Sequence, residues 1–156
     1  MGTVMLRGIL VSGLGQGRAF TALDWVRAQF LARLGIDPYP GTLNVRLEAP
    51  AEQAAWERLR ALPGITIEPI SPEFCEARAY LVRVAKGYLS VPLKTAEGQQ
   101  AAIILPNVPD YPHNQVELVA AVNLRRALGL VEGDAVSVWV DERYLPQNAL
   151  QGLRSP

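Results

Sequence analysis

Hydrophobic residues along most of this 156-residue chain follow the alternation, or the short unbroken runs, that are typical of β-strands. The first run, residues 4–11, reads VMLRGILV and holds β-branched residues without a helical stop signal. After residue 74 such runs follow closely, separated by turn-forming Lys-Gly and Glu-Gly pairs. The predicted extended segments are 4–11, 42–45, 66–70, 77–85, 88–93, 100–105, 115–120 and 135–140.

Three segments carry helical spacing instead: residues 22–34, 51–62 and 123–128. Thr21 with Asp24 resembles a capping box at the start of the first helix. The residues expected to pack against the core are Leu23, Val26, Phe30, Leu31 and Leu34 from the first helix and Trp56 and Leu59 from the second. These stripes are interpreted as core.

Sequential hairpins interrupted by a few helices indicate a mainly β, single-domain protein of the α+β class. A small closed β-barrel is favoured, because closure is the usual way in which short strands lose their exposed edges. We assign the domain to residues 1–140. Residues 141–156 form a C-terminal tail that is expected to be peripheral, since it loses hydrophobic periodicity and gathers Pro, Gln, Asn and Ser.

Charge and cysteine content narrow the class of protein further. Fifteen basic and fifteen acidic side chains cancel, so no net field favours nucleic acid or an anionic membrane as a partner. Cys75 has no second cysteine with which to pair, and neither a signal segment nor a membrane-length apolar run is present. The sequence therefore predicts a cytoplasmic protein, and nothing in it indicates an oligomeric state.

The candidate chemistry centres on PYPGTLNV, in which Pro40 and Gly41 form a turn that leads into an extended segment. Thr42 and Asn44 are two residues apart, so on a strand their side chains share a face. Both offer neutral oxygen atoms, which suit Mg²⁺ when the phosphates of a nucleotide supply the negative charge. The alternative is that Pro-Gly makes a turn while Thr42 and Asn44 satisfy local backbone groups.

A second candidate is the segment SGLGQGR at residues 12–18, which follows the first predicted strand. Its three glycines, at alternate positions, free one edge of a loop from side chains and let backbone N–H groups approach an anion. Arg18 adds a planar cation for phosphate. The spacing matches neither the Walker A pattern nor the dinucleotide-binding fingerprint.

Together these segments resemble the CTP-dependent riboflavin kinases known mainly from archaea. The resemblance covers about residues 4–140. Its four blocks are SGLGQGR at 12–18, YPGTLNV at 39–45, the loop that contains Tyr111 and Pro112 and leads to Glu117, and VNLR at 122–125, with a lesser match at Phe74, Cys75 and Ala77. The resemblance implies a compact six-stranded barrel of the cradle-loop type, and a flavin substrate, riboflavin, that is converted to FMN while CTP becomes CDP.

The resemblance also implies roles for individual residues. Thr42 and Asn44 would hold one Mg²⁺ ion, and Glu117 would accept a hydrogen bond from the flavin. The nucleotide-binding residues would be Gly13, Leu14, Gly15, Gln16, Gly17 and Arg18 at the phosphates and Val122, Asn123, Leu124 and Arg125 at the cytidine. Carbonyl and N–H groups of a short ordered segment can read cytosine without a charged pocket.

Two positions depart from the family pattern. Pro109 stands where members usually carry a threonine that contacts the flavin, and proline offers neither a hydroxyl nor an N–H group. Gln16 stands where an acidic residue is common. The flavin-binding part of the assignment therefore rests on fewer matching residues than the nucleotide-binding part.

Glu117 is also the candidate catalytic residue, to orient or deprotonate the acceptor hydroxyl of riboflavin. On a strand it could equally be a solvent-facing alternate residue. Two rival functions remain open: a related small-molecule kinase with another phosphoryl donor or acceptor, and a nucleotide- or flavin-binding module without turnover.

Overall fold

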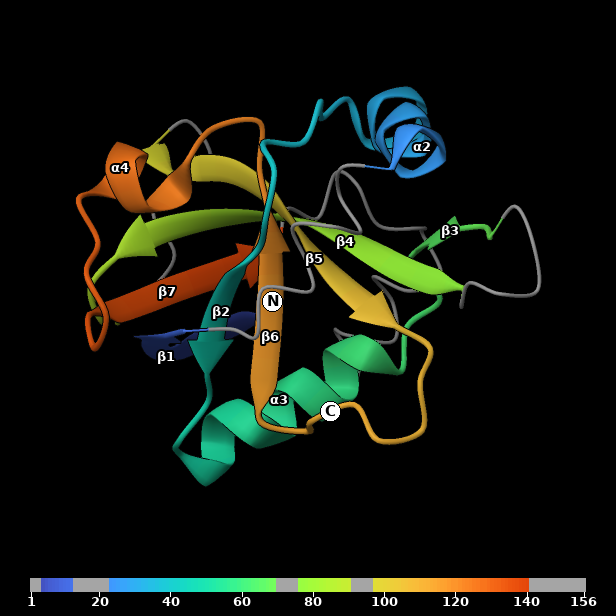
Figure 1. Cartoon of the computed structure of the whole chain (residues 1–156). Helices are drawn as coiled ribbons and strands as arrows, with labels where there is room; N and C mark the ends of the chain where they lie inside the picture. Colours follow the sequence, from blue (N-terminus) through green and yellow to red (C-terminus); the bar gives the residue numbers. More distant parts are fainter. Residues whose placement is uncertain (1–3, 13–22, 70–75, 91–96, 141–156) are drawn as a thin grey trace.

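The structure is a computed structural model, and it describes residues 4–12, 23–69, 76–90 and 97–140. These ranges contain seven β-strands and three α-helices (Figure 1). The strands are β1 (Met5–Val11), β2 (Leu43–Arg46), β3 (Ile65–Ile67), β4 (Ala77–Lys86), β5 (Gln99–Pro106), β6 (Gln115–Val119) and β7 (Ala135–Val140), and the helices are α2 (Asp24–Leu34), α3 (Pro50–Arg60) and α4 (Leu124–Leu128). Among these described elements, every helix is too short or too polar to cross a membrane.

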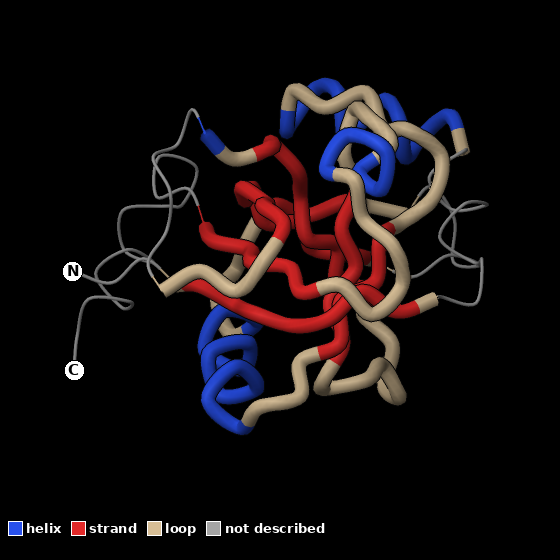
Figure 2. The backbone as a smooth tube through the Cα atoms, turned by 90° about the vertical axis from the view of Figure 1, so that its left-hand side faces the viewer, coloured by secondary structure: helices blue, strands red, loops and turns tan. Residues whose placement is uncertain are grey.

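Six of the strands close into a ring (Figure 2). In the order β4–β5–β6–β2–β1–β7 each strand pairs antiparallel with the next, and β7 pairs back to β4. β3 lies outside the ring: it pairs with residues 77–79 of β4, whereas β7 pairs with residues 82–86. Each ring strand therefore has two neighbours, which confirms the predicted mainly β, single-domain fold with closed strands.

Apolar side chains fill the inside of the ring and also the space beneath α2. Along β6, Val116 and Leu118 are buried in the inner cluster, and Gln115 and Glu117 alternate with them on the outer face. The inner cluster includes Leu6, Leu10, Val45, Tyr80, Val82, Ile103, Val136 and Val138, together with Trp56 and Leu59 of α3, which are buried as predicted. The outer cluster joins Val26, Phe30 and Leu34 of α2 to Ala79, Leu81, Ala102, Ile104 and Val119.

The first helix differs from its predicted form in two respects. Leu31, expected on the buried stripe, is 57% exposed, because α2 contacts the ring through the i, i+4 row Val26, Phe30 and Leu34. The helix begins at Asp24 with Leu23 as its N-cap, so Asp24 cannot hold the third helical position that a capping box requires. Thr21 lies outside the described residues.

The predicted strand at 88–93 is absent over its described part, residues 88–90. The backbone of Leu89 bonds to side chains instead of to a neighbouring strand. Its N–H donates to Ser137 Oγ over 3.0 Å, and its carbonyl accepts from Arg7 Nη1 over 3.0 Å. The turn-and-hairpin pattern of the sequence thus misidentified a segment that is held by side chains.

A single carboxylate joins α3 to β1 where the strand has no partner on one side. β2 pairs with residues 9–11 of β1 only. Earlier on β1, Glu52 Oε1 accepts the backbone N–H of Arg7 over 2.9 Å, and Glu52 Oε2 accepts from the Arg7 guanidinium over 3.0 Å. Glu52 is 5% exposed, so its charge depends on these donors.

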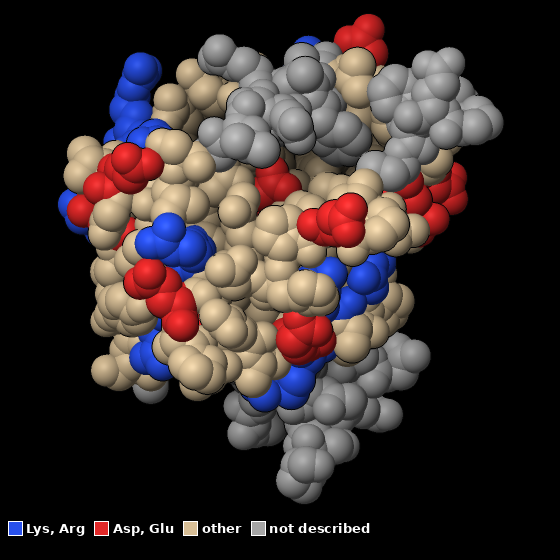
Figure 3. All heavy atoms as spheres, turned by 60° about the horizontal axis from the view of Figure 1, so that its bottom comes forward, with Lys and Arg blue, Asp and Glu red and all other residues tan. Residues whose placement is uncertain are grey.

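On the face shown in Figure 3, lysine and arginine side chains lie among aspartate and glutamate side chains. Elsewhere on the surface, for example, Arg46 lies 3.1 Å from Glu48, and both side chains are exposed. Such exposed pairs contribute little stability.

Replacing Glu52 tests the link between α3 and β1. Glu52→Ala is expected to lower the free energy of unfolding by about 2 kcal/mol, because the Arg7 N–H and guanidinium lose a charged acceptor. Urea denaturation measures this change. Glu57→Ala, on the exposed side of the same helix, is the matched control and should stay within about 0.5 kcal/mol of the parent. Equal stability of the two variants would contradict a structural role for Glu52.

Candidate functional site

The register between β2 and β6 brings the predicted polar residues together. Asn44 lies directly opposite Glu117 in this antiparallel pair. Since the neighbours Leu43 and Leu118 are buried inside the ring, the side chains of Asn44 and Glu117 share the outer face. Thr42, just before β2, is two residues from Asn44 and reaches the same Glu117. Residues 71 to 75 positions apart in the sequence therefore form one polar cluster.

Hydrogen bonds fix this cluster. Thr42 Oγ1 donates to Glu117 Oε1 over 3.2 Å, and the Tyr111 hydroxyl donates to Glu117 Oε2 over 2.6 Å. Gln115 Nε2 donates to Asn44 Oδ1 over 3.0 Å, and Asn44 is only 6% exposed. Glu117 is therefore engaged through both carboxylate oxygens, unlike a solvent-facing alternate residue.

Tyr111 is held in its protonated form. Burial raises the pKa of its hydroxyl far above the usual value, and the charge of Glu117 and the hydrogen bond to it raise the pKa further. The hydroxyl thus remains a donor throughout the physiological range. Tyr111 was predicted only as part of the proline-rich loop, without a role.

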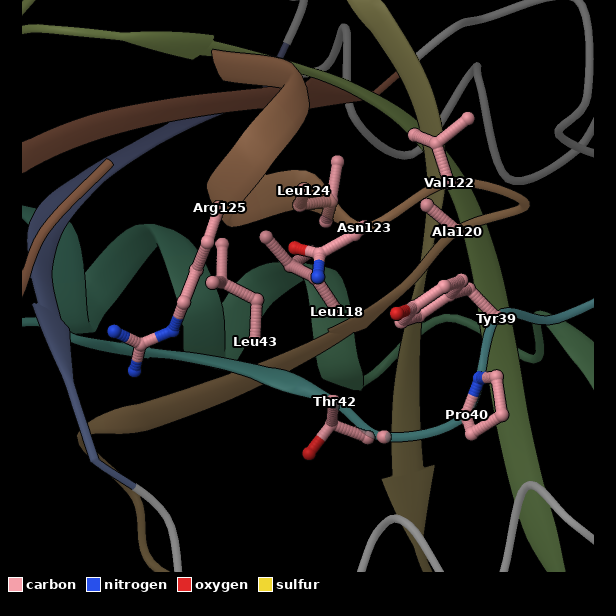
Figure 4. Close-up of a pocket in the computed structure, with 11 residues that line it drawn as sticks. Tyr39, Pro40, Thr42, Leu43, Leu118, Ala120, Val122, Asn123, Leu124 and Arg125 are labelled. Carbon is pink, nitrogen blue, oxygen red and sulfur yellow. The ribbon is translucent and has the colours of Figure 1, made fainter. Parts of the chain in front are cut away.

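A pocket opens beside this cluster, with Thr42 on its wall (Figure 4). Its volume is about 190 Å³. This is below the ~300–1,000 Å³ that is usual for a whole drug-sized ligand, so the pocket has room for only part of a ligand of that size. It is lined by Tyr39, Pro40, Gly41, Thr42 and Leu43 on one side and by Leu118, Ala120, Val122, Asn123, Leu124 and Arg125 on the other. The structure thus brings the predicted cytidine-binding segment and one predicted metal ligand to the same hollow.

Asn123 has two roles that depend on different atoms. As the N-cap of α4, its Oδ1 accepts the backbone N–H of Arg126 over 3.1 Å. Its amide nitrogen points into the pocket, toward Thr42 (Figure 4). A hydrogen-bond donor is therefore held in the pocket by the same contact that begins the helix.

Arg125 brings a positive charge to the pocket. Its side chain extends along the pocket wall (Figure 4). The pKa of Glu132 is lowered, first by the hydrogen bonds from Ser12 and to a smaller extent by Arg125. Arg125 and Ser12, which follows β1, therefore both favour the ionised form of Glu132.

The glycine-rich segment itself lies outside the described residues, and so do the predictions for Gly13, Leu14, Gly15, Gln16, Gly17 and Arg18. The residue before it is fixed: the N–H and the hydroxyl of Ser12 both donate to Glu132 Oε1, over 2.9 Å and 2.5 Å. One residue earlier, Val11 pairs with Asn44. The chain therefore leaves β1 next to the polar cluster.

Pro109 lies apart from the pocket lining. It is exposed, in the loop between β5 and β6, two residues before Tyr111.

Gln115 was missed by the sequence analysis. Its spacing, two residues before Glu117 on one strand, was a usable signal, because it places both side chains on one face. Tyr39 was included in the family block at 39–45, but no role was predicted for it.

The fold and the site together define a small, closed antiparallel β-domain with a ligand pocket beside a cluster of neutral and acidic oxygen atoms. The family model CTP-dep_RFKase, described as "Domain of unknown function DUF120", matches residues 10–140. The chain belongs to this family.

Named relatives agree with this assignment. The chain is 39% identical to a riboflavin kinase of Methanocella arvoryzae over 140 residues, which are 90% of this chain and 58% of that protein. It is 38% identical to a riboflavin kinase of Archaeoglobus fulgidus over 143 residues, 89% of this chain and 55% of that protein. For a riboflavin kinase of Halobacterium salinarum the identity is 34% over 143 residues, 90% of this chain and 58% of that protein. The chain thus spans somewhat more than half the length of these relatives.

Substitutions at Asn123 separate its capping atom from its pocket atom. Asn123→Ala is expected to lower the free energy of unfolding by about 1 kcal/mol, because the N–H of Arg126 loses its acceptor. Asn123→Ser keeps a capping oxygen and should remain within about 0.5 kcal/mol of the parent. Guanidinium denaturation followed by circular dichroism measures both. If Asn123→Ser is as unstable as Asn123→Ala, the cap does not explain the position.

Proposed function

We propose that this chain is a CTP-dependent riboflavin kinase, which transfers the γ-phosphoryl group of CTP to the terminal ribityl hydroxyl of riboflavin and yields FMN and CDP. The observation that carries the proposal is the position of Thr42, which lines the pocket and also bonds to Glu117. The names of the relatives support the acceptor, and the name of the family model supports the donor.

Mg²⁺ would be held by Thr42 and Asn44. Both residues fit this ion, since each presents a neutral oxygen with a lone pair left over after its hydrogen bond within the cluster. Within the described ranges, no three His, Cys, Asp or Glu side chains gather into a metal site. A weakly charged ligand set of this kind suits an ion that arrives with phosphates, whose charge it neutralises during transfer.

The pocket would take the cytidine end of the nucleotide. Tyr39 and Val122, both partly exposed apolar side chains on its wall, offer surfaces for a planar base. The amide nitrogen of Asn123 can donate to an acceptor on cytosine. Arg125 supplies a cation, and residues 13–18 would meet the phosphates. The departure of β1 beside Asn44 supports this last role.

Glu117 would accept a hydrogen bond from the flavin and orient the acceptor hydroxyl. Phosphoryl transfer passes through a loose transition state in which little proton removal is needed early, so positioning carries most of the rate. The two hydroxyl donors that hold Glu117 favour an orienting role over proton abstraction. Pro109, which has no hydroxyl, motivates a second candidate: a kinase of the same family with another phosphoryl donor or acceptor.

A donor screen tests the proposed reaction. The protein is incubated with riboflavin, Mg²⁺ and each of CTP, ATP, GTP and UTP, and the flavins are separated by chromatography. We expect FMN to form with CTP at least about tenfold faster than with any other nucleotide, because the pocket is small and holds a placed donor. Faster turnover with another nucleotide would favour the altered-donor kinase. If no FMN forms with any nucleotide, the kinase proposal is wrong and the rival reading, a binding module without turnover, is favoured.

Removing both proposed metal ligands tests the metal assignment. The variant Thr42→Ala/Asn44→Ala should lose at least about 100-fold in FMN formation, since even outer partners of a metal site are worth 10–100-fold. The control Thr66→Ala/Asn107→Ala removes the same side chains from positions outside the pocket and should retain turnover. Circular dichroism checks that both variants are folded. Turnover at the parent rate by the first variant would show that the metal assignment is wrong.

A further inference from the structure

Tyr111 and Gln115, to which neither the family resemblance nor the sequence assigns a role, are linked by hydrogen bonds to the proposed metal ligands. Tyr111 donates to Glu117, which accepts from Thr42, and Gln115 donates to Asn44. These bonds lie on the outer face of the ring, where β2 pairs with β6. They form a second layer around the site.

The hydrogen bonds from Thr42 and Tyr111 to Glu117 control where the Thr42 hydroxyl directs its proton. A hydroxyl has one proton and two lone pairs, whereas an ionised carboxylate can only accept. Donation to Glu117 Oε1 over 3.2 Å therefore turns the Thr42 proton away from the pocket side and leaves lone pairs for a cation. A Thr42 hydroxyl free to rotate would lose this preference.

Tyr111 keeps Glu117 in the position that this requires. Its hydroxyl lies 2.6 Å from Glu117 Oε2, the short distance typical of a hydrogen bond to a charged acceptor. Tyr111 is 9% exposed and belongs to the inner core cluster, so its ring is fixed by packing. The carboxylate is thus anchored at one oxygen by a rigid side chain and turned toward Thr42 at the other.

Gln115 orients Asn44 in the way that Glu117 orients Thr42. A carboxamide can exchange its oxygen and its nitrogen by rotating about half a turn, with little change in shape. Donation from Gln115 Nε2 over 3.0 Å favours the rotamer in which Asn44 Oδ1, and not its NH₂ group, occupies this side. One lone pair of that oxygen remains available.

We propose that Tyr111 and Gln115 are positioning residues that orient Thr42 and Asn44 for the metal–nucleotide complex. This inference rests on the proposed function, because it concerns the same site. Neither residue touches the metal, so their loss should weaken metal-dependent nucleotide binding without changing binding of the metal-free nucleotide. Outer partners of metal ligands typically contribute 10–100-fold.

The test is calorimetric titration of CTP at a series of Mg²⁺ concentrations and in EDTA. For Tyr111→Phe and Gln115→Met we expect the Mg²⁺ concentration that gives half of the full gain in CTP affinity to rise about tenfold. Affinity in EDTA should equal that of the parent. In the FMN assay the same variants should have a raised Mg²⁺ requirement, and saturating Mg²⁺ should restore most of kcat.

Matched controls lose comparable hydrogen bonds elsewhere. Tyr80→Phe removes a buried hydroxyl that donates to the Leu62 carbonyl over 2.7 Å. Gln53→Met removes a carboxamide that donates to the Leu47 carbonyl over 2.9 Å. Both controls should keep the parent's Mg²⁺ requirement, even where thermal unfolding shows reduced stability.

The outcomes distinguish this inference from the proposed function. If Mg²⁺ strengthens CTP binding by the parent but Tyr111→Phe and Gln115→Met have the parent's Mg²⁺ requirement, or a lower one, the positioning roles are wrong and the metal assignment stands. If the controls shift as much as these two variants, the effect is general destabilisation and the inference fails. If Mg²⁺ has no effect on CTP binding by the parent, both the inference and the proposed metal role are overturned.

Discussion

The constraint on which the site depends is the register between β2 and β6. β2 has four residues, and the alternation of Leu43 and Val45 inward with Asn44 outward excludes a shift of the pairing by one residue. A slip of one residue would move the apolar side chains out of the core and turn Asn44 into it, at the cost of burying an unsatisfied amide. Ordinary core packing therefore holds Asn44 opposite Glu117, and no separate device is needed to assemble the cluster.

Local patterns in the sequence predicted most strands and helices, but they did not predict how these elements contact one another. Turn residues and strand periodicity correctly gave most strands, the burial of Trp56 and Leu59, and the shared face of Thr42 and Asn44. The prediction of a strand at 88–90 was wrong because the hydrogen bonds that Leu89 donates to Ser137 and accepts from Arg7 are invisible in a local pattern. The contacts of Glu117 with Thr42 and of Gln115 with Asn44 span 75 and 71 residues, so only the closed ring could reveal them.

The connection between α4 and β7 ties the pocket to the end of β1. Gly133 donates its N–H to the Leu10 carbonyl over 2.8 Å, Leu10 donates its N–H to the Asp134 carbonyl over 2.9 Å, and Glu132 accepts from Ser12. The short helix that presents Asn123 is thereby anchored to the strand that leads into the glycine-rich segment. One turn thus holds the helix that carries Asn123 against the end of β1.

The two-sided bonding of Glu117 has a thermodynamic consequence. One oxygen faces Tyr111 and the other faces Thr42. Under the proposed function, a flavin bonded to Glu117 and a cation bound by Thr42 would therefore perturb the same carboxylate, and linkage would require each substrate to alter the affinity for the other by an equal factor. Such coupling would act through one shared side chain and would need no movement of the ring.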